Sequence, residues 1–138
     1  MIDKERFSPP SAGGIVLNSG AVVLDVNDIE REAAFWSVVI DEEPGPLRGD
    51  GGWLTVGELA PAMWLVLQRV PEAKLVKNRC HLDFHVTDVD EALRKIIVLG
   101  GSQVGEIRPG GGVTCADPEG NEFCIGAFKR DKSGNRVY

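Results

Sequence analysis

The sequence predicts an α+β domain made of two copies of one unit, in which a strand and a helix are followed by three shorter strands (βαβββ). Residues 21–29 resemble residues 81–89, and residues 51–56 resemble residues 110–115. The matched pairs in the first comparison are Leu24 with Phe84, Val26 with Val86, Asp28 with Asp88 and Ile29 with Val89. Two units of about sixty residues therefore follow one another, which indicates a duplication.

The first unit begins with an apolar stretch at 21–26 that predicts a strand. Asp28 follows as a helix N-cap, because its carboxylate can accept from the free backbone N–H groups of the first turn. Apolar residues then recur at steps of four, three and four, which predicts a helix with one buried stripe. The stripe consists of Ile29, Ala33, Trp36 and Ile40, with Trp36 as a core residue. Three strands are expected near 43–48, 52–57 and 62–69.

The second unit begins with a strand at 80–86 whose side chains alternate between two faces. Leu82, Phe84 and Val86 share the face expected beneath the helix, and His81, Asp83 and His85 share the other. Asp88 is the predicted N-cap of the next helix, and Glu91 stands at the spacing of a capping box. The acidic residues of the first turns are placed where the helix dipole favours negative charge; they are Glu30, Glu32, Asp90 and Glu91.

The second helix is predicted by an apolar stripe that ends at a pair of glycines; its residues are Val89, Leu93, Ile96, Leu99, Gly100 and Gly101. Three strands are expected near 102–108, 112–116 and 121–128. The segment Asp117-Pro118-Glu119-Gly120 suits a type I turn, so the last two strands should form a hairpin.

Composition limits the class of protein. The 138 residues have a formal net charge of −6, with 43% hydrophobic residues, which is too apolar for a disordered chain. An acidic domain is poorly suited to bind nucleic acid or an anionic membrane. Three cysteines without zinc-type spacing, and no predicted signal peptide or membrane span, favour a cytoplasmic protein. We expect tails at 1–18 and 129–138 around one domain, 19–128, with modules at about 19–70 and 79–128.

Three motifs within these units resemble the vicinal oxygen chelate superfamily, which includes glyoxalase I, extradiol dioxygenases, fosfomycin-resistance enzymes and bleomycin-resistance proteins. They are Val26-Asn27-Asp28 with Phe35-Trp36, the run from His81 to Asp88, and the run from Asp117 to Phe123. The segment Gln68-Arg69-Val70 is similar to that of glyoxalase-like bacterial members. The resemblance implies a curved mixed sheet that forms a trough, with the helices on its convex side, and a homodimer.

The resemblance also implies a divalent metal in the trough. His81 matches the ligand position on the first strand of the second unit, and Ala21, which cannot bind a metal, takes the equivalent place in the first. Cys124 falls where the family usually has a glutamate, and Gln68 is the candidate from the first unit. A set of His81, Gln68 and Cys124 would suit zinc or nickel better than magnesium, because thiolate is a soft ligand. The alternative is that no metal is bound.

Other polar and aromatic residues are candidates for roles in the trough. His81 could be a ligand or a general base with Asp83 orienting it, and Gln68 would lie near the reacting atoms; a purely structural His–Asp pair is the alternative. His85, Trp53 and Trp64 are candidates for contact with a ligand. Gly110-Gly111-Gly112 is interpreted as a hairpin at the entrance, since neither a Gly-Lys-Ser/Thr motif nor a helix follows it.

Three functions remain open from the sequence. The first is a glyoxalase-like lyase or isomerase that acts on a small oxygenated or thiol-adduct substrate. The second is a metal-free binding protein of the bleomycin-resistance type, in which Trp53 and Trp64 contact the ligand and the acidic surface attracts a cationic one. The third is a protein with an empty cleft and a structural or regulatory role.

Overall fold

The computed structural model describes residues 14–128 and 131–135. The first half of the chain contains β1 (Gly20–Val26), α1 (Ile29–Val39), β2 (Trp53–Ala60) and β3 (Met63–Arg69). The second half contains β4 (Asp83–Val86), α2 (Val89–Val98), β5 (Ser102–Val104), β6 (Val113–Ala116) and β7 (Glu122–Ala127). Most of the two predicted tails, namely 1–13, 129–130 and 136–138, lies outside the described residues.

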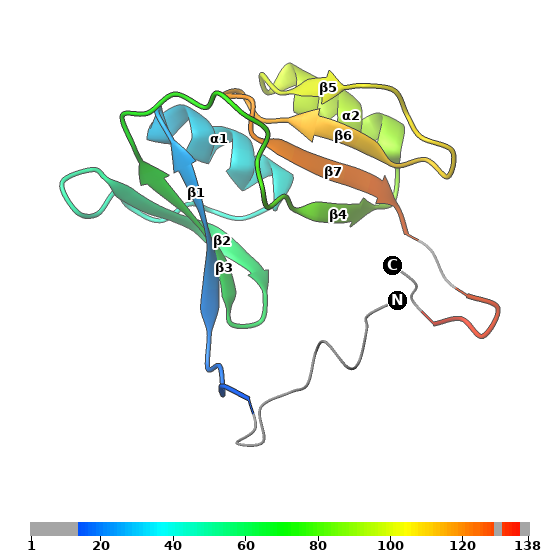
Figure 1. Ribbon diagram of the computed structural model, residues 1–138, viewed down its shortest axis with the longest axis horizontal. Helices are drawn as coiled ribbons and strands as arrows, with labels where there is room; N and C mark the ends of the chain where they lie inside the picture. Colours follow the sequence, from blue (N-terminus) through cyan, green and yellow to red (C-terminus); the bar gives the residue numbers. More distant parts are fainter. Residues whose placement is uncertain (1–13, 129–130, 136–138) are drawn as a thin grey trace, which may run out of the picture.

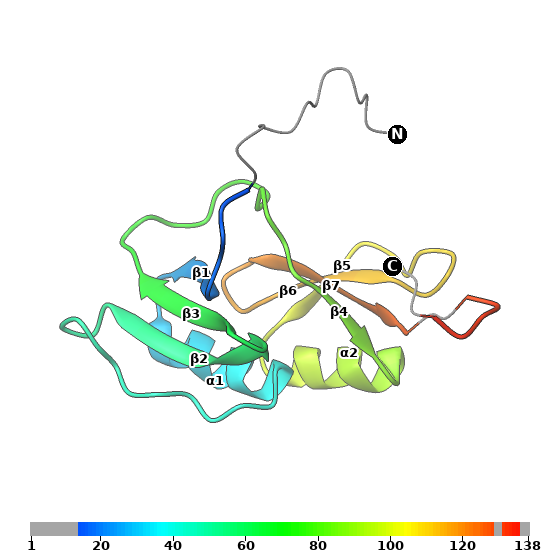
Figure 2. The ribbon, with the colours of Figure 1, turned by 90° about the horizontal axis from the view of Figure 1, so that it is seen from below.

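The strands form two sheets with matching orders, β1-β3-β2 and β4-β7-β6-β5 (Figure 1). In each sheet the first strand pairs in parallel with the last, and the last pairs antiparallel with the strand before it. The α+β fold of two related modules is therefore confirmed. Both helices lie on one side of the molecule, beneath the sheets in Figure 2, so each sheet has an open face on the other side.

The predicted strand at 43–48 does not form. Arg48 makes an isolated bridge to Trp53, and the Gly45 N–H donates to the Thr55 carbonyl at 2.9 Å. Pro44 and Pro46 stand on either side of Gly45 and have no backbone N–H to donate, which prevents a continuous ladder. The first sheet consequently has three strands where the second has four.

Both predicted N-caps are confirmed. The side chain of Asp28 accepts from the Arg31 backbone N–H at 3.1 Å, and that of Asp88 accepts from the Glu91 N–H at 3.0 Å. The glutamate half of the capping box is absent from the hydrogen bonds of the described residues. The Glu91 carboxylate instead lies 3.1 Å from Lys95 Nζ, one turn further along α2.

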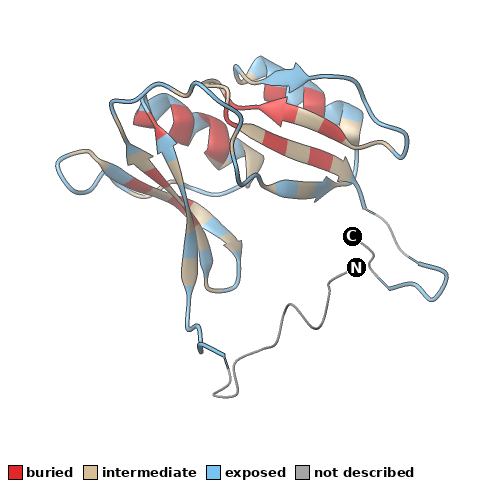
Figure 3. Cartoon of the chain, in the orientation of Figure 1, coloured by how far each residue is buried: buried red, intermediate tan, exposed pale blue. Residues whose placement is uncertain are grey.

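The core joins the two modules around Trp36, which is 2% exposed and is confirmed as a core residue. Its ring centroid lies 4.9 Å from that of Phe123 on β7 and 6.4 Å from that of Phe84 on β4. Buried residues gather on both helices and along β2, β3, β6 and β7 (Figure 3). Helix α1 of the first module therefore packs against apolar side chains of the second.

The environment of Glu32 differs from the one expected from the sequence. Its side chain is fully buried, whereas the sequence placed it among acids that stabilise a helix N-terminus by their charge. Burial, followed by the hydrogen bond and the charge of Asp117, raises the pKa of Glu32 to about 10. The carboxyl is therefore neutral at pH 7, because a buried carboxylate beside a second carboxylate is strongly disfavoured.

Candidate functional site

Three side chains of ligand type meet on the open face of the second sheet: those of His81, Asp83 and Cys124. Asp83 on β4 is the register partner of Cys124 on the neighbouring β7. His81 stands two residues before Asp83, and the Leu82 carbonyl between them accepts from the Cys124 N–H at 2.9 Å. This pairing continues the line of β4 beyond its first residue, so the side chains of His81 and Asp83 point to the same face.

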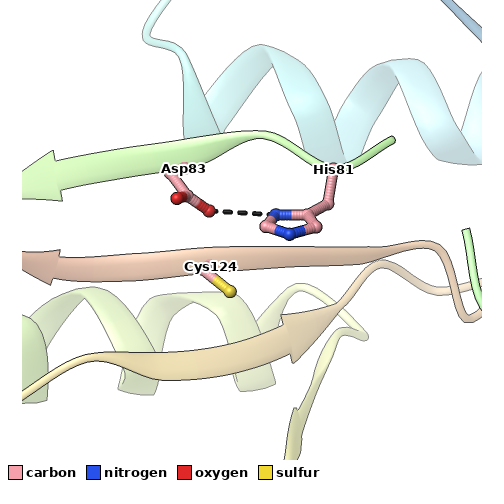
Figure 4. Close-up of side chains that lie close together, drawn as sticks. All are labelled: His81, Asp83 and Cys124. Atoms are coloured by element: carbon pink, nitrogen blue, oxygen red, sulfur yellow. Dashed lines mark ion pairs between the residues drawn. The ribbon is translucent and has the colours of Figure 1, made fainter. Parts of the chain in front are cut away.

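The three side chains are close enough to contact one ligand or metal ion. His81 Nδ1 lies 3.0 Å from Asp83 Oδ1, and one ligand atom from each of the three residues lies within 4.8 Å of the others (Figure 4). The side chains of His81 and Asp83 are 40% and 30% exposed. A ligand in solution could therefore reach both groups.

The donor set tests whether a metal would fit. Imidazole nitrogen, carboxylate oxygen and thiolate sulfur are all zinc ligands, whereas magnesium prefers oxygen alone. The contact between Nδ1 and Asp83 favours the tautomer with its proton on Nδ1, which leaves the lone pair of His81 Nε2 available to a metal ion. The residues present thus fit zinc or another borderline-soft divalent ion.

The sulfur of Cys124 has two further polar neighbours that the sequence analysis did not single out. Thr114 Oγ1 on β6 lies 3.5 Å from Cys124 Sγ. Arg108 donates from Nη1 to Thr114 Oγ1 at 3.0 Å, and its Nη2 lies 3.9 Å from the sulfur. Thr114 could have been found only from the β6–β7 register, which pairs it with Cys124. Arg108 has one sequence signal, its place just before Pro109 and the three glycines.

A cavity of about 320 Å³ lies beside the cluster. It extends over β4 and β7 and is bounded by the loop between β5 and β6; its lining includes Asp83, His85, Arg108, Gly112, Cys124 and Gly126. His85 thus faces the same space as the cluster. The ring of His85 also packs edge-on against Phe128, with centroids 6.4 Å apart.

The first module has apolar residues at the positions equivalent to His81 and Cys124. Ala21 and His81 line one cavity of about 310 Å³ between the two sheets, as their equivalent positions suggest. The pairing of Val23 with Val66 repeats that of Asp83 with Cys124, so Val66 takes the place equivalent to Cys124. The duplication therefore gives the first module no polar ligand at either equivalent position.

Gln68 lies on the open face of the first sheet, where it pairs with Asp25 on β1 and with Trp53 on β2. It is four residues beyond Trp64, the partner of Ala21, which corresponds to roughly 13 Å along a strand. The structure therefore brings His81, Asp83 and Cys124 together, and it leaves Gln68 on the other sheet.

The two candidate tryptophans, Trp53 and Trp64, also lie on the open face of the first sheet. Trp53 is 40% exposed and packs against Gly49, where an added Cβ would be 3.0 Å from the indole ring. Neither tryptophan lines the cavity beside the cluster or the cavity between the sheets. Their predicted contact with a ligand stays a prediction.

The fold and the position of this cluster define the class of protein. Two related modules with helices on one side, and ligand-type side chains on the open face, identify a member of the vicinal oxygen chelate superfamily. The chain belongs to the Glyoxalase-like domain family, whose pattern it matches over residues 21–126. No match to a curated protein was found.

Solved structures with this fold include three different proteins. A mutant of the fosfomycin resistance protein FosX from Listeria monocytogenes, complexed with Mn(II) and 1S,2S-dihydroxypropylphosphonic acid, is 18% identical, with a TM-score of 0.62 over 81% of this chain and 89% of that chain. A glyoxalase-related enzyme from Fulvimarina pelagi is 16% identical, with a TM-score of 0.60 over 89% and 99%. A glyoxalase/bleomycin resistance protein from Albidiferax ferrireducens is 19% identical, with a TM-score of 0.54 over 77% and 95%. At these identities the similarity shows the shared fold alone.

Among the described residues, neither helix has the length and apolar character needed to cross a membrane.

Proposed function

We propose that this protein is a glyoxalase-like enzyme of the lyase or isomerase type that acts on a small oxygenated or thiol-adduct substrate. Its site would use a divalent metal held by His81 and Cys124, with Asp83 beside them. The observation that carries the proposal is the convergence of the three ligand-type groups within 4.8 Å on an accessible face. When bound, the metal would supply Lewis-acid polarisation of a substrate oxygen.

The residues of the chain itself would do the rest of the work. Asp83 accepts from His81 Nδ1 and so fixes the orientation of the imidazole, with Nε2 directed away from Asp83. An unprotonated Nε2 can either bind the metal or accept a proton from a substrate. Thr114, whose Oγ1 lies 3.5 Å from the Cys124 sulfur, would hold this thiol in position.

The comparison with FosX supports the metal part of the proposal. That protein was solved with Mn(II) and a phosphonic acid on the same fold. The donor set differs here, because a thiol occupies the position where the family resemblance implies a glutamate, and Ala21 and Val66 supply no ligand. We therefore expect zinc or nickel to bind more tightly than manganese.

Metal titration tests this function. The purified protein, stripped with a chelator, is loaded with zinc, nickel, cobalt or manganese, and bound metal is measured by elemental analysis after gel filtration. We expect about one zinc per chain and a thiolate-to-metal charge-transfer band with cobalt. Both should be lost in His81→Ala, and the band should be lost in Cys124→Ser.

The matched control is His85→Ala, which removes the same type of side chain from β4, four residues beyond His81 and outside the three-residue group. It should keep the metal stoichiometry of the wild type. If no metal binds under any loading, or if His85→Ala loses metal as fully as His81→Ala, the metal-dependent enzyme is ruled out.

The second candidate function is a metal-free binding protein of the bleomycin-resistance type. The observation that favours it is the absence of a polar ligand at Ala21 and Val66, together with two tryptophans on the open face of the first sheet. A thermal-shift screen of small molecules on the metal-free protein would support it if Trp53→Ala and Trp64→Ala abolish the shift and His81→Ala does not.

We also propose a homodimer. On the open face of the first sheet, Val23 and Trp53 are each more than one third exposed, and neither helix lies on this side of the sheet (Figure 2). A second copy of the chain could cover this face and complete the trough. Light scattering during gel filtration should give twice the monomer mass, and a monomer at all concentrations would contradict the proposal.

A further inference from the structure

We propose that Arg108 forms an anion-binding subsite, which selects ligands carrying a carboxylate or a phosphonate or phosphate group. The subsite lies in the cavity beside the cluster, and the bound molecule would extend from Arg108 toward His81 and Cys124. This inference names the substrate class of the proposed function. Anion binding at Arg108 does not depend on that function; only the reaction at the His81 end of the ligand rests on it.

The guanidinium of Arg108 lines the cavity without a carboxylate partner. The chain has 21 acidic and 15 basic residues, yet in the part that the structure describes Arg108 belongs to none of the ion pairs. Its side-chain hydrogen bonds go to a neutral hydroxyl, that of Thr114, and to the Cys124 sulfur. A guanidinium has five N–H donors in a planar fork, so donors remain for an oxyanion.

The loop that carries Arg108 is held in place by its own backbone. The Arg108 N–H donates to the Gly112 carbonyl at 2.8 Å, and the Gly111 N–H donates to the Arg108 carbonyl at 2.9 Å. Gly110 and Gly111 have φ values of 97° and 93°, which residues other than glycine rarely adopt. These bonds set the backbone of Arg108, and the hydrogen bond to Thr114 holds its guanidinium, so less order has to be imposed when a ligand binds.

Glycines also provide the space around the guanidinium. A Cβ on Gly112 would stand 3.1 Å from Arg108 Nη2, so any larger residue there would displace the guanidinium. Gly126 lies beside Gly112 in the lining, where an added Cβ would be 3.8 Å from the Gly112 Cα. The volume of about 320 Å³ suits a ligand at the small end of the usual range.

Apart from Arg108, the charged or titratable residues that line this cavity are Asp83, His85 and Cys124. Asp83 carries the opposite sign, but its carboxylate is engaged by His81 at 3.0 Å. We therefore place the anionic group of the ligand at the Arg108 end and its uncharged oxygens or thioether at the His81 end.

Binding of simple anions to the metal-free protein tests the subsite. Acetate, methylphosphonate and inorganic phosphate are titrated by calorimetry or by NMR chemical shifts, with acetamide as the uncharged probe. We expect saturable binding of at least one anion, none of acetamide, and a loss in affinity of about tenfold to a hundredfold in Arg108→Gln. Either a carboxylate or a phosphonate preference supports the proposal, and the tighter anion identifies the class.

Two further variants make the test specific. Arg94→Gln on α2 removes the same charge from an exposed position outside the cavity and should bind anions as the wild type does. Gly112→Ala keeps every charge and should weaken anion binding by crowding the guanidinium. Equal weakening in Arg108→Gln and Arg94→Gln, or no anion binding by the wild type, overturns the proposal.

Metal titration of the same variants separates this inference from the proposed function. Arg108→Gln should lose the anion and keep one zinc per chain. A wild-type protein that binds anions through Arg108 but binds no metal would uphold the subsite and refute the metal-dependent enzyme.

Discussion

Trp36 Nε1 on α1 lies 3.1 Å from Asp117 Oδ2, in the turn between β6 and β7 of the other module. The same N–H lies 3.3 Å from Glu32 Oε2, so one donor serves two buried carboxyl groups. Asp117 in turn accepts from the backbone N–H groups of Glu119 and Asn121, each at 2.9 Å. The two modules are thus joined by a buried polar network directly beside the aromatic core.

The first prediction concerns the proton on Glu32. Its pKa is about 10 in the folded protein and about 4.5 when unfolded, so between these values the folded state holds one proton more. Stability should therefore fall as pH rises across this interval, by up to about 1.4 kcal/mol per pH unit from this group. Glu32→Gln should remove that dependence, because the amide can still donate to Asp117.

Urea denaturation of the wild type and Glu32→Gln at pH 5 to 8 would measure it. The variant should gain stability relative to the wild type as pH increases. Glu30→Gln, an exposed acid of the same helical turn, is the control and should show no such trend. A difference between Glu32→Gln and the wild type that does not change with pH would contradict the assigned proton.

The second prediction concerns the donor of Trp36. Trp36→Phe keeps an aromatic ring but removes the N–H that both carboxyl groups accept. We expect a loss of about 2 kcal/mol or more, since hydrogen bonds to charged groups are worth about 1.5–3 kcal/mol. Trp53→Phe, at the partly exposed position, should change the free energy of unfolding by less than about 0.5 kcal/mol. Similar losses in both variants, measured by urea denaturation, would refute the importance of the network.

The third prediction concerns the packing at Gly101. A Cβ there would stand 2.7 Å from the Ala116 carbonyl oxygen and 2.9 Å from the Phe35 ring. Gly101→Ala should cost about 1–3 kcal/mol, because overpacking a tight site forces its neighbours apart. The melting temperature should fall accordingly. Gly126→Ala adds the same methyl where the nearest atom is 3.8 Å away and should be tolerated, so an equal fall in both would count against this account.

The fourth prediction concerns the reactivity of the thiols of Cys115 and Cys80. Burial, with a smaller contribution from Cys124, raises the pKa of Cys115 to about 11. Cys115 should therefore resist iodoacetamide at pH 8 in the folded protein, whereas the exposed Cys80 should react. Mass spectrometry of peptides after timed alkylation would measure this. Modification of Cys115 at the rate of Cys80 without unfolding would show that the buried position is wrong.

The sequence predicted the elements that depend on local patterns. The N-caps Asp28 and Asp88, the two helical stripes and the turn at Asp117 were found because each is specified by residues within one or two turns. The apolar alternation around His81 and Asp83 likewise placed both on the open face. The strand expected at 43–48 from the repeated layout of the two units was wrong, because two of its residues are prolines, which lack the N–H groups that a ladder needs.

Other features required the folded chain. Glu32 looks like any acid in a first helical turn until α1 packs against Asp117, which is far away in the sequence. Arg108 and Thr114 reach Cys124 only because β5, β6 and β7 are neighbours in one sheet. Val66 rather than Gln68 matches Cys124 because strand register, which shifts by whole residues with turn length, sets the equivalence.

The amino-acid sequence by itself determined the doubled α+β architecture and the face on which His81 and Asp83 lie, since period and caps are local properties of the chain. The tertiary structure alone decided which groups share a site. It added Arg108 and Thr114 to Cys124 and separated Gln68 from His81, because strand pairing brings residues distant along the chain within a few ångströms of one another.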